Sequence, residues 1–246
     1  DLKAHRADTR WMVQSDRVMT FTYTKPLFVS PDGTCKESNR LDHHNPDPTP
    51  PDLQEAVLDN LRRVLPQVDA VIILDQVTAP EHGVVTTRVR QAITKVAAAN
   101  PRVIFYADSR ARISLFRDVI IKCNDLEAIR AVHAELQGKQ PLETVRECLP
   151  ALSRLTRRPV FVTCGKDGIL ALGADGRTAH VPGVRVEGPI DIVGAGDSCT
   201  AGSVAALCAG ATLEEAAAVG NLTASLTIQV IGTTGTTTRP AILKRF

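Results

Sequence analysis

Two glycines and an aspartate stand together in the segment DIVGAGDSCTAGSV, residues 191–204, directly before a run of small residues that suit a helix. Asp197 alone fits a helix N-cap, because its carboxylate can accept hydrogen bonds from free amides of the first turn. That interpretation leaves Gly194 and Gly196 unexplained. Glycines at such positions let the backbone approach a ligand and turn its amides toward an anion. The segment therefore predicts an anion site at a helix start.

A carboxylate beside a bound anion needs a chemical reason, because like charges repel. A general base supplies that reason when it takes the proton from a hydroxyl that attacks the anion, as in phosphoryl transfer. The segment is not a P-loop, since no Gly-Lys-Ser/Thr follows, and it lacks the third glycine of the dinucleotide fingerprint. We therefore expect Asp197 to act as a general base, in an anion site that is neither a P-loop nor a dinucleotide-binding loop.

The composition is that of an ordinary globular protein. The chain has 246 residues, of which 43% are hydrophobic and 23% charged, which excludes disorder and collagen as overall classes. The 29 basic and 27 acidic residues leave a net charge of +2, too even to predict a nucleic-acid or membrane-surface partner. No apolar run approaches the ~20 residues of a membrane span, and no signal peptide opens the chain, so we expect a cytoplasmic protein.

The six cysteines include no CxxC pair and no closely spaced ligand set with histidine. This pattern favours free thiols in a reducing compartment and argues against a zinc hydrolase. The adjacent His43 and His44 suit a solvated loop better than a metal site.

From Asp52 onward, strand and helix patterns alternate, which predicts an α/β layered core. We expect strands at 71–74, 103–107, 119–121, 160–163 and 169–172. We expect a first helix that opens at Asp52, and further helices at 85–96, 125–137, 142–155, 197–209 and 213–229. Pro150 should kink or split the helix at 142–155. In such sheets ligands bind beyond the carboxyl ends of the strands, which is where the Gly194–Asp197 turn would lie.

The first part of the chain has a different character. A strand-like pattern from Phe21 to Val29 is followed by the turn sequence SPDG, and together they predict a β-hairpin or small sheet. The segment NPDPTPP, residues 45–51, can continue neither a strand nor a helix interior and marks a boundary.

Three motifs together resemble the ribokinase/PfkB family of carbohydrate kinases. Residues 191–197 match the family signature D-x-x-G-A-G-D, which opens a helix. Upstream, IIKCNDLEA at 120–128 resembles the family's strand followed by N-x-x-E, and VTCGKDGILAL at 162–172 resembles its nucleotide-contacting strand-turn-strand. The resemblance covers about residue 68 to the C-terminus. It implies a three-layer ribokinase-like (Rossmann-like) α/β core with a small β lid.

The resemblance also assigns roles to residues. Asp197 would be the catalytic base, and the anion hole for the transferring phosphoryl group would be formed by Gly194, Ala195 and Gly196. Glu127 would organise Mg²⁺ together with Asn124. In relatives activated by a monovalent cation such as K⁺, the position of Asp191 belongs to that cation's site.

Binding of ATP is the other implied role. The residues assigned to the nucleotide site are Asn124, Thr163, Gly165, Lys166 and Asn221. Several of the assigned residues have a simpler explanation: Asn124 and Glu127 could cap a helix, Lys166 could be a solvated turn lysine, and Asn221 could lie on a helix surface.

The hairpin resembles the lid that these kinases lay over the sugar to exclude water. The lid region and the tail from residue 212 to 238 resemble the heptose-phosphate kinase branch. Arg17, Lys25 and Arg40 could therefore meet a phosphate already on the substrate, or they could form a charged hairpin face. Because family lids often pair, a homodimer through the lid is a further expectation.

The expected division is a β-rich lid and connecting segment at 1–45 and a nucleotide-binding and catalytic core at 52–246, without the family's first strands and glycine-rich sugar motif. The sequence departs from the family at Cys199, which replaces the usual aromatic, and at Lys122-Cys123-Asn124, which replaces Lys-Pro-Asn. We expect an ATP-dependent sugar or sugar-phosphate kinase. The alternatives are a nucleoside kinase on the same scaffold and a catalytically silent, ligand-binding regulator.

Overall fold

Six strands form one sheet in the spatial order β10-β9-β8-β7-β6-β5. The computed structural model describes residue 2 and residues 7–246, apart from the side chains of Cys35 and Glu37. The strands are β5 (Ala70–Asp75), β6 (Ile104–Ser109), β7 (Ile120–Asn124), β8 (Val160–Thr163), β9 (Ile169–Leu172) and β10 (Thr178–Val181). Strands β5 to β8 are parallel, whereas β9 and β10 are added antiparallel. The carboxyl ends of the four parallel strands therefore meet at one edge.

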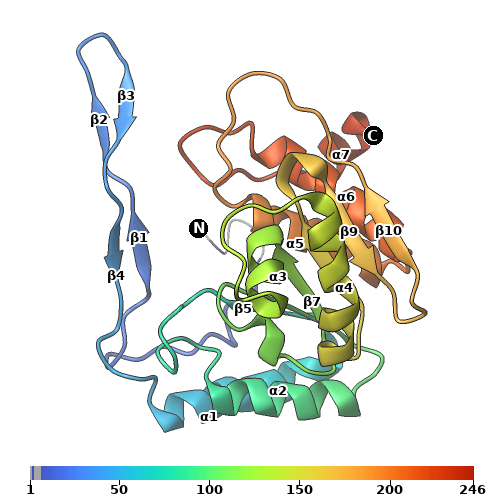
Figure 1. Cartoon of the computed structure of the whole chain (residues 1–246). Coiled ribbons are helices and arrows are strands. Elements are labelled where there is room, and N and C mark those ends of the chain that lie inside the picture. The colour runs from blue at the N-terminus through green and yellow to red at the C-terminus, as the bar shows by residue number, and fades with distance from the viewer. Residues whose placement is uncertain (1, 3–6) are drawn as a thin grey trace.

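Helices cover both faces of this sheet (Figure 1). They are α1 (Pro51–Val64), α2 (Thr87–Ala99), α3 (Asp125–Val132), α4 (Leu142–Thr156), α5 (Ala195–Cys208), α6 (Leu213–Thr227) and α7 (Arg239–Arg245). One apolar cluster joins α1 to α4 to one face, and a second joins α5 and α6 to the other. Side chains that alternate along the strands feed both clusters, as a sheet buried on two sides requires. The expected three-layer α/β core is confirmed.

Several expected boundaries need correction. Helix α4 runs unbroken through Pro150, because buried Cys148, Leu149 and Leu152 hold that stretch against the sheet. Helix α3 ends at Val132 instead of residue 137: the amide of Leu136 bonds to the His133 carbonyl, and a turn brings Leu136 onto the core. Strand β10 and helix α7 were not expected, since both are short, with four and seven residues.

Four short strands precede the core and form the expected β-hairpin. Strand β1 (Thr22–Thr24) pairs with β4 (Leu41–His43), and β2 (Leu27–Val29) pairs with β3 (Cys35–Glu37), both antiparallel. The turn at 30–33 is closed by a 2.8 Å hydrogen bond from the Gly33 amide to the Ser30 carbonyl. The hairpin stands away from the α/β layers (Figure 1). Residues 1 and 3–6 of the expected segment 1–45 lie outside the described residues.

Within the described part of the chain, no helix is both long and apolar enough to cross a membrane. Cys123, Cys148, Cys164, Cys199 and Cys208 are free thiols. The Cys35 side chain lies outside the described residues.

Candidate active site

An open cleft of about 1160 Å³ lies where the parallel strands end, which is large enough to hold both a nucleotide and a small acceptor. Of the residues expected at the site, the cleft is lined by Asn124, Glu127, Thr163, Gly165, Lys166, Gly194, Ala195, Gly196, Asp197 and Asn221. Of the residues expected to form the catalytic, nucleotide and metal sites, Asp191 is not part of its lining. The fold thus brings residues from β7, α3, β8, α5 and α6 and their loops to one place.

The glycine-aspartate turn begins helix α5. Gly194 is the N-cap, with a φ of +79° that favours glycine, and a Cβ at this position would lie 2.5 Å from Thr234 Cγ2. The helix therefore starts at Ala195, two residues earlier than expected. The N-cap interpretation of Asp197 is wrong, because Asp197 is the third residue of the helix.

The first turn of α5 leaves backbone amides without acceptors. Ala195 donates to the Ile192 carbonyl (3.1 Å) and Ser198 to the Gly194 carbonyl (2.9 Å). The amides of Gly196 and Asp197, between them, find no acceptor among the described residues. Free amides at the positive end of a helix dipole form a site for an anion. The Asp197 side chain beside them is exposed, and no described residue forms a hydrogen bond or ion pair with it.

Asn124 and Glu127 form a capping box at the start of α3. The Asn124 Oδ1 accepts from the Glu127 amide, and the Glu127 Oε2 accepts from the Asn124 amide, both at 2.8 Å. The structure thus confirms that Asn124 and Glu127 cap the helix. Burial raises the pKa of Glu127, and the nearby Asp108 charge adds to this rise, while the hydrogen bond from Asn124 opposes it.

The capping box leaves Glu127 with one carboxylate oxygen, Oε1, that has no hydrogen-bond partner among the described residues. A hard cation such as Mg²⁺ prefers oxygen ligands and keeps several waters, with few protein carboxylates. In the described part of the chain, no group of three or more His, Cys, Asp or Glu residues could form a full metal cage. Glu127 in this cleft therefore fits a metal held mainly by waters and substrate phosphates.

The residues expected at the nucleotide have structural contacts of their own. Asn221 Nδ2 donates to the carbonyls of Val181 (3.1 Å) and Pro182 (3.0 Å), which fixes α6 to the end of β10. The Thr163 hydroxyl donates to the Cys123 carbonyl at 3.4 Å. Lys166 is exposed on the turn between β8 and β9.

Asp191 lies outside the cleft and links two loops. Its Oδ1 accepts from the Val193 amide at 3.0 Å, and its Oδ2 accepts from the Gly232 amide at 3.1 Å. These bonds, that of Val193 first, lower the pKa of Asp191. The carboxylate thereby holds the loop that leads into α5 against the turn at 228–235.

A buried ion pair under the start of α5 is absent from the expectations. Lys122 Nζ donates to Asp108 Oδ2 at 2.6 Å, and both side chains are buried and also line the cleft. Burial lowers the pKa of Lys122, but the charge and hydrogen bond of Asp108 outweigh it, so the pKa is raised overall. The sequence feature that could have indicated this ion pair is a lysine, Lys122, inside the otherwise apolar strand pattern of residues 120–123.

Residues of the hairpin also line the cleft, namely Tyr23, Lys25, Arg40, Asp42 and His44. Arg40 forms a two-point ion pair with Asp42, at 2.6 and 2.8 Å, and its guanidinium lies 4.9 Å from the centre of the Tyr23 ring. Arg17 instead pairs with Asp52 at the start of α1 and is not part of the lining. Of the three basic residues expected near a substrate phosphate, Lys25 and Arg40 therefore reach the cleft.

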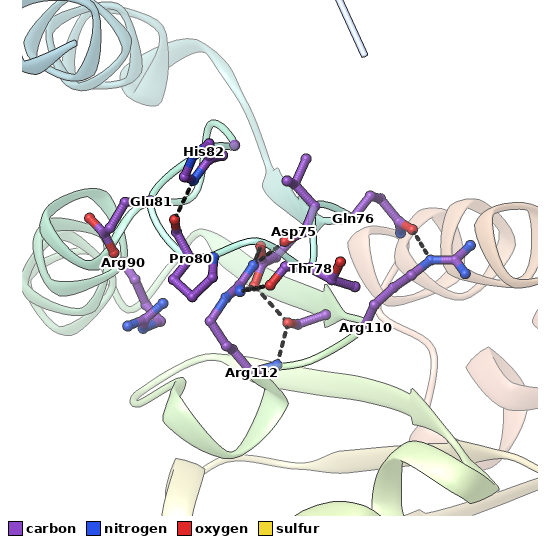
Figure 2. Close-up of polar contacts among 12 residues, drawn as sticks. Asp75, Gln76, Thr78, Pro80, Glu81, His82, Arg90, Arg110 and Arg112 are labelled. Carbon is purple, nitrogen blue, oxygen red and sulfur yellow. Dashed lines mark hydrogen bonds and ion pairs between the residues drawn. The ribbon is translucent and has the colours of Figure 1, made fainter. Parts of the chain in front are cut away.

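A second polar network joins the ends of β5 and β6 (Figure 2). Asp75 accepts from Arg112 Nη2 (2.6 Å) and Nε (3.0 Å), and from the Ser109 hydroxyl (2.7 Å). Asp75 and Arg112 do not line the cleft. Arg110 does, and its Nε donates to Gln76 Oε1 at 2.7 Å (Figure 2).

The sequence model of the pfkB family of carbohydrate kinases matches residues 84–239. The chain belongs to this family. The bifunctional protein HldE of Vibrio vulnificus strain YJ016 is 28% identical over 180 residues, which cover 73% of this chain and 36% of that protein. The HldE protein of Rhodospirillum rubrum is 37% identical over 99 residues, or 40% of this chain and 19% of that protein. The chain thus matches at most about a third of these two relatives.

Solved structures of a ribokinase and of a phosphofructokinase share the fold. Arabidopsis thaliana ribokinase, in a complex with ribose and ATP, matches with a TM-score of 0.64 and 19% identity, over 91% of this chain and 69% of the ribokinase. Escherichia coli phosphofructokinase-2 matches with a TM-score of 0.58 and 20% identity, over 77% of this chain and 61% of that chain. At these identities the likeness establishes the ribokinase-like architecture alone.

Proposed function

We propose that this chain transfers the γ-phosphoryl group of ATP to a hydroxyl of a sugar or sugar phosphate. The observation that carries the proposal is the start of α5, where the free amides of Gly196 and Asp197 and the unpaired Asp197 carboxylate face one cleft. Membership of a family of carbohydrate kinases and the ribokinase-like fold support the same activity.

Asp197 acts as the general base. Its carboxylate takes the proton of the acceptor hydroxyl as the hydroxyl oxygen forms a bond to the γ-phosphorus. The bond from that phosphorus to the bridging oxygen breaks, and its electron pair leaves with ADP. Negative charge on the transferred group is met by the free amides of Gly196 and Asp197, which the turn through Gly194 and Ala195 places at the positive end of α5. The products are ADP, the phosphorylated acceptor and one proton.

Glu127 would hold Mg²⁺, and Asn124 positions Glu127 through the capping box. The Glu127 Oε1, which has no hydrogen-bond partner in the described part of the chain, is the oxygen available for this task. When bound, Mg²⁺ neutralises charge on the nucleotide phosphates. The role explains why a half-buried carboxylate faces a cleft built for an anion, where its own charge would otherwise be unfavourable.

The nucleotide lies along the wall formed by the turn after β8 and by α6. Thr163, Gly165 and Lys166 contribute from the turn, and Asn221 contributes from α6. Because both Asn221 N–H groups are engaged by backbone carbonyls, its Oδ1 is the atom left to accept from a ligand.

The hairpin serves as a lid over the acceptor and pairs with a second copy of the chain. Its side chains line the cleft from one side, and several of its apolar residues are exposed: Leu27 (49%), Phe28 (65%), Val29 (68%) and Leu41 (54%). Exposed apolar residues on short strands are a surface suited to another subunit.

Asp191 would contribute to a monovalent-cation site at the loop before α5. A gain in activity with KCl over tetramethylammonium chloride, abolished by Asp191→Ala, is the expected result. Equal activity of the native chain in both salts would remove this part of the proposal.

The direct test of the proposed function is ADP release by the full chain with Mg-ATP and a panel of sugars, sugar phosphates and nucleosides. We expect acceptor-dependent ADP release with a sugar or a sugar phosphate. Release with a nucleoside alone would assign a nucleoside kinase. Binding of Mg-ATP without release for any acceptor would favour the ligand-binding regulator.

A further inference from the structure

We infer that Arg110 determines which acceptors the cleft takes, because its guanidinium binds an anionic group on the acceptor, either a phosphate or a carboxylate. The inference rests on the proposed phosphoryl transfer and narrows the class of its acceptor. Arg110 is a specificity-determining residue, and Gln76 is the positioning residue that orients it.

The register of β5 and β6 brings these two residues together. Asp75 and Ser109 are directly paired positions of the two parallel strands, and their side chains bond to each other at 2.7 Å, outside the lining of the cleft. The next residues, Gln76 and Arg110, line the cleft, since successive side chains of extended backbone point to opposite faces. A bond of 3.2 Å from the Arg110 amide to the Asp75 carbonyl continues the pairing and sets Gln76 beside Arg110.

Gln76 holds the guanidinium by one nitrogen and leaves the others free. Arg110 Nε donates to Gln76 Oε1 at 2.7 Å (Figure 2). A guanidinium carries five N–H groups, and the four on Nη1 and Nη2 have no acceptor among the described residues. Arg110 is exposed, and within the described part of the chain it forms no ion pair. Its planar fork is therefore available to the oxygens of a phosphate or carboxylate, which accept two parallel hydrogen bonds from arginine.

Arg112, two positions further on, shows how a structural arginine behaves at the same turn. Its Nε and Nη2 donate to Asp75 at 3.0 and 2.6 Å, and its Nη1 donates to the Thr78 carbonyl at 2.9 Å. It thereby ties the loop after β5 to the loop after β6. Arg110 leads away from Asp75 to Gln76 (Figure 2). Arg112 thus uses its donors within the protein, whereas Arg110 keeps most of them for the cleft.

The strand order sets Arg110 on the acceptor side of the cleft. The proposed nucleotide wall is formed by the turn after β8 and by α6, and β7 separates β8 from β6. Neighbouring strands lie about 4.8 Å apart, so β6 is about 10 Å from β8. The start of α5 lies above β7, since a Cβ added at Gly196 would be 3.1 Å from Lys122 Nζ. The transferred group therefore lies between the nucleotide on the β8 side and Arg110 on the β6 side.

The charges of this wall favour an acceptor that carries a negative charge of its own. Two carboxylates of the cleft lining are already paired, Asp42 with Arg40 and Asp108 with Lys122. The other carboxylates of the lining belong to α3 and α5. Arg110 therefore has no carboxylate partner where β5 and β6 end. A neutral sugar in this place would shield the guanidinium from water without replacing the lost hydrogen bonds, which is unfavourable.

The test compares Arg110→Met with the native chain on three forms of the best sugar in the panel: the free sugar, its terminal phosphate ester and its sugar acid. For the native chain we expect the highest kcat/KM with one of the two anionic forms, which identifies the group as a phosphate or a carboxylate. Arg110→Met should raise the KM for that form about 10- to 100-fold, as for lost hydrogen bonds to a charged group. The KM for Mg-ATP, the kcat and the Tm should be nearly unchanged.

Two further variants separate this role from a structural one. Gln76→Glu supplies a carboxylate that pairs with Arg110, so it should keep Tm while raising the KM for the anionic form, whereas a merely structural pair would leave that KM unchanged. Arg130→Met is the matched control. Arg130 is exposed, lies outside the cleft lining and donates to the Arg110 carbonyl at 3.3 Å, so its loss removes one charge at the same turn and spares the guanidinium. Its KM values should stay close to native.

The outcomes separate a failure of the proposed function from a failure of this inference. If the native chain releases no ADP with any acceptor, the proposed function fails and this inference fails with it. If the native chain is active but prefers the free sugar, or if Arg110→Met keeps the native KM for the anionic form, this inference alone is overturned. A rise in the KM for Mg-ATP in place of the acceptor KM would also overturn it, because Arg110 would then contact the nucleotide.

Discussion

Asp191 Oδ2 accepts a hydrogen bond at 3.1 Å from the amide of Gly232, which lies 41 positions further along the chain. The other carboxylate oxygen accepts from Val193, one residue before the N-cap of α5. One side chain thus fixes the approach to the candidate anion site against a distant turn. The position of α5 depends on this link as well as on its own packing.

Asp191→Asn should weaken this link, because an amide has one acceptor oxygen where the carboxylate has two. The folded-state pKa of Asp191 is below the ordinary value of 3.8, so its stabilising contribution is present above that value and is lost as the pH falls through the lowered pKa. The variant should therefore have a lower Tm than the native chain at pH 7, and the difference should shrink on acidification below pH 3.8. A Tm difference that stays constant over that range would contradict this explanation.

Glu127→Gln separates capping from metal binding. A glutamine at the third helical position can still accept the Asn124 amide, so the start of α3 should persist and Tm without ligand should be nearly unchanged. The amide cannot replace a carboxylate at a hydrated Mg²⁺, so the Mg²⁺-dependent part of the Tm rise with ATP should fall. ATP with EDTA is the control, and it should act equally on both proteins. An unchanged Mg²⁺ dependence would leave Glu127 with capping alone.

Phe28→Asp tests pairing through the lid. Phe28 is 65% exposed in this chain, and burial against a second copy would make a charge there unfavourable. We expect the native chain to be a dimer by size-exclusion chromatography with light scattering, and the variant to be a monomer. Leu243→Asp, at a residue 66% exposed on α7, is the matched control and should remain dimeric. A native monomer, or a dimeric Phe28 variant, would reject pairing through this surface.

Local features of the site were predictable from the sequence. The turn around Gly194 and the pair Asn124 and Glu127 consist of residues close together in the chain. Their residue types indicate the local backbone structure, which is a glycine turn at one position and a helix start at the other. The capping box of Thr212 and Glu215 was predictable on the same basis and is present at the start of α6.

Relationships across the sheet were not predictable from the sequence. Asp108 and Lys122 meet because β6 and β7 pair in one register, and a shift of that register would move each of them against other neighbours. The bond from Gly232 to Asp191 likewise depends on where the chain returns after α6. The prediction placed the end of α3 too late because Leu136 lies at the spacing expected of an apolar helix residue. In the structure a turn after Val132, instead of a further helical turn, brings Leu136 to the core.

The most direct measurement is the turnover of Asp197→Asn beside its stability and its nucleotide affinity. The Asp197 side chain is exposed and forms no hydrogen bond or ion pair with the described residues, so Asn should cost at most the helix-dipole contribution of about 0.3–1 kcal/mol. Asparagine cannot accept the proton, so we predict that kcat falls by about 10²–10⁴ with Mg-ATP affinity kept. Native turnover in a folded Asp197→Asn variant would contradict the account.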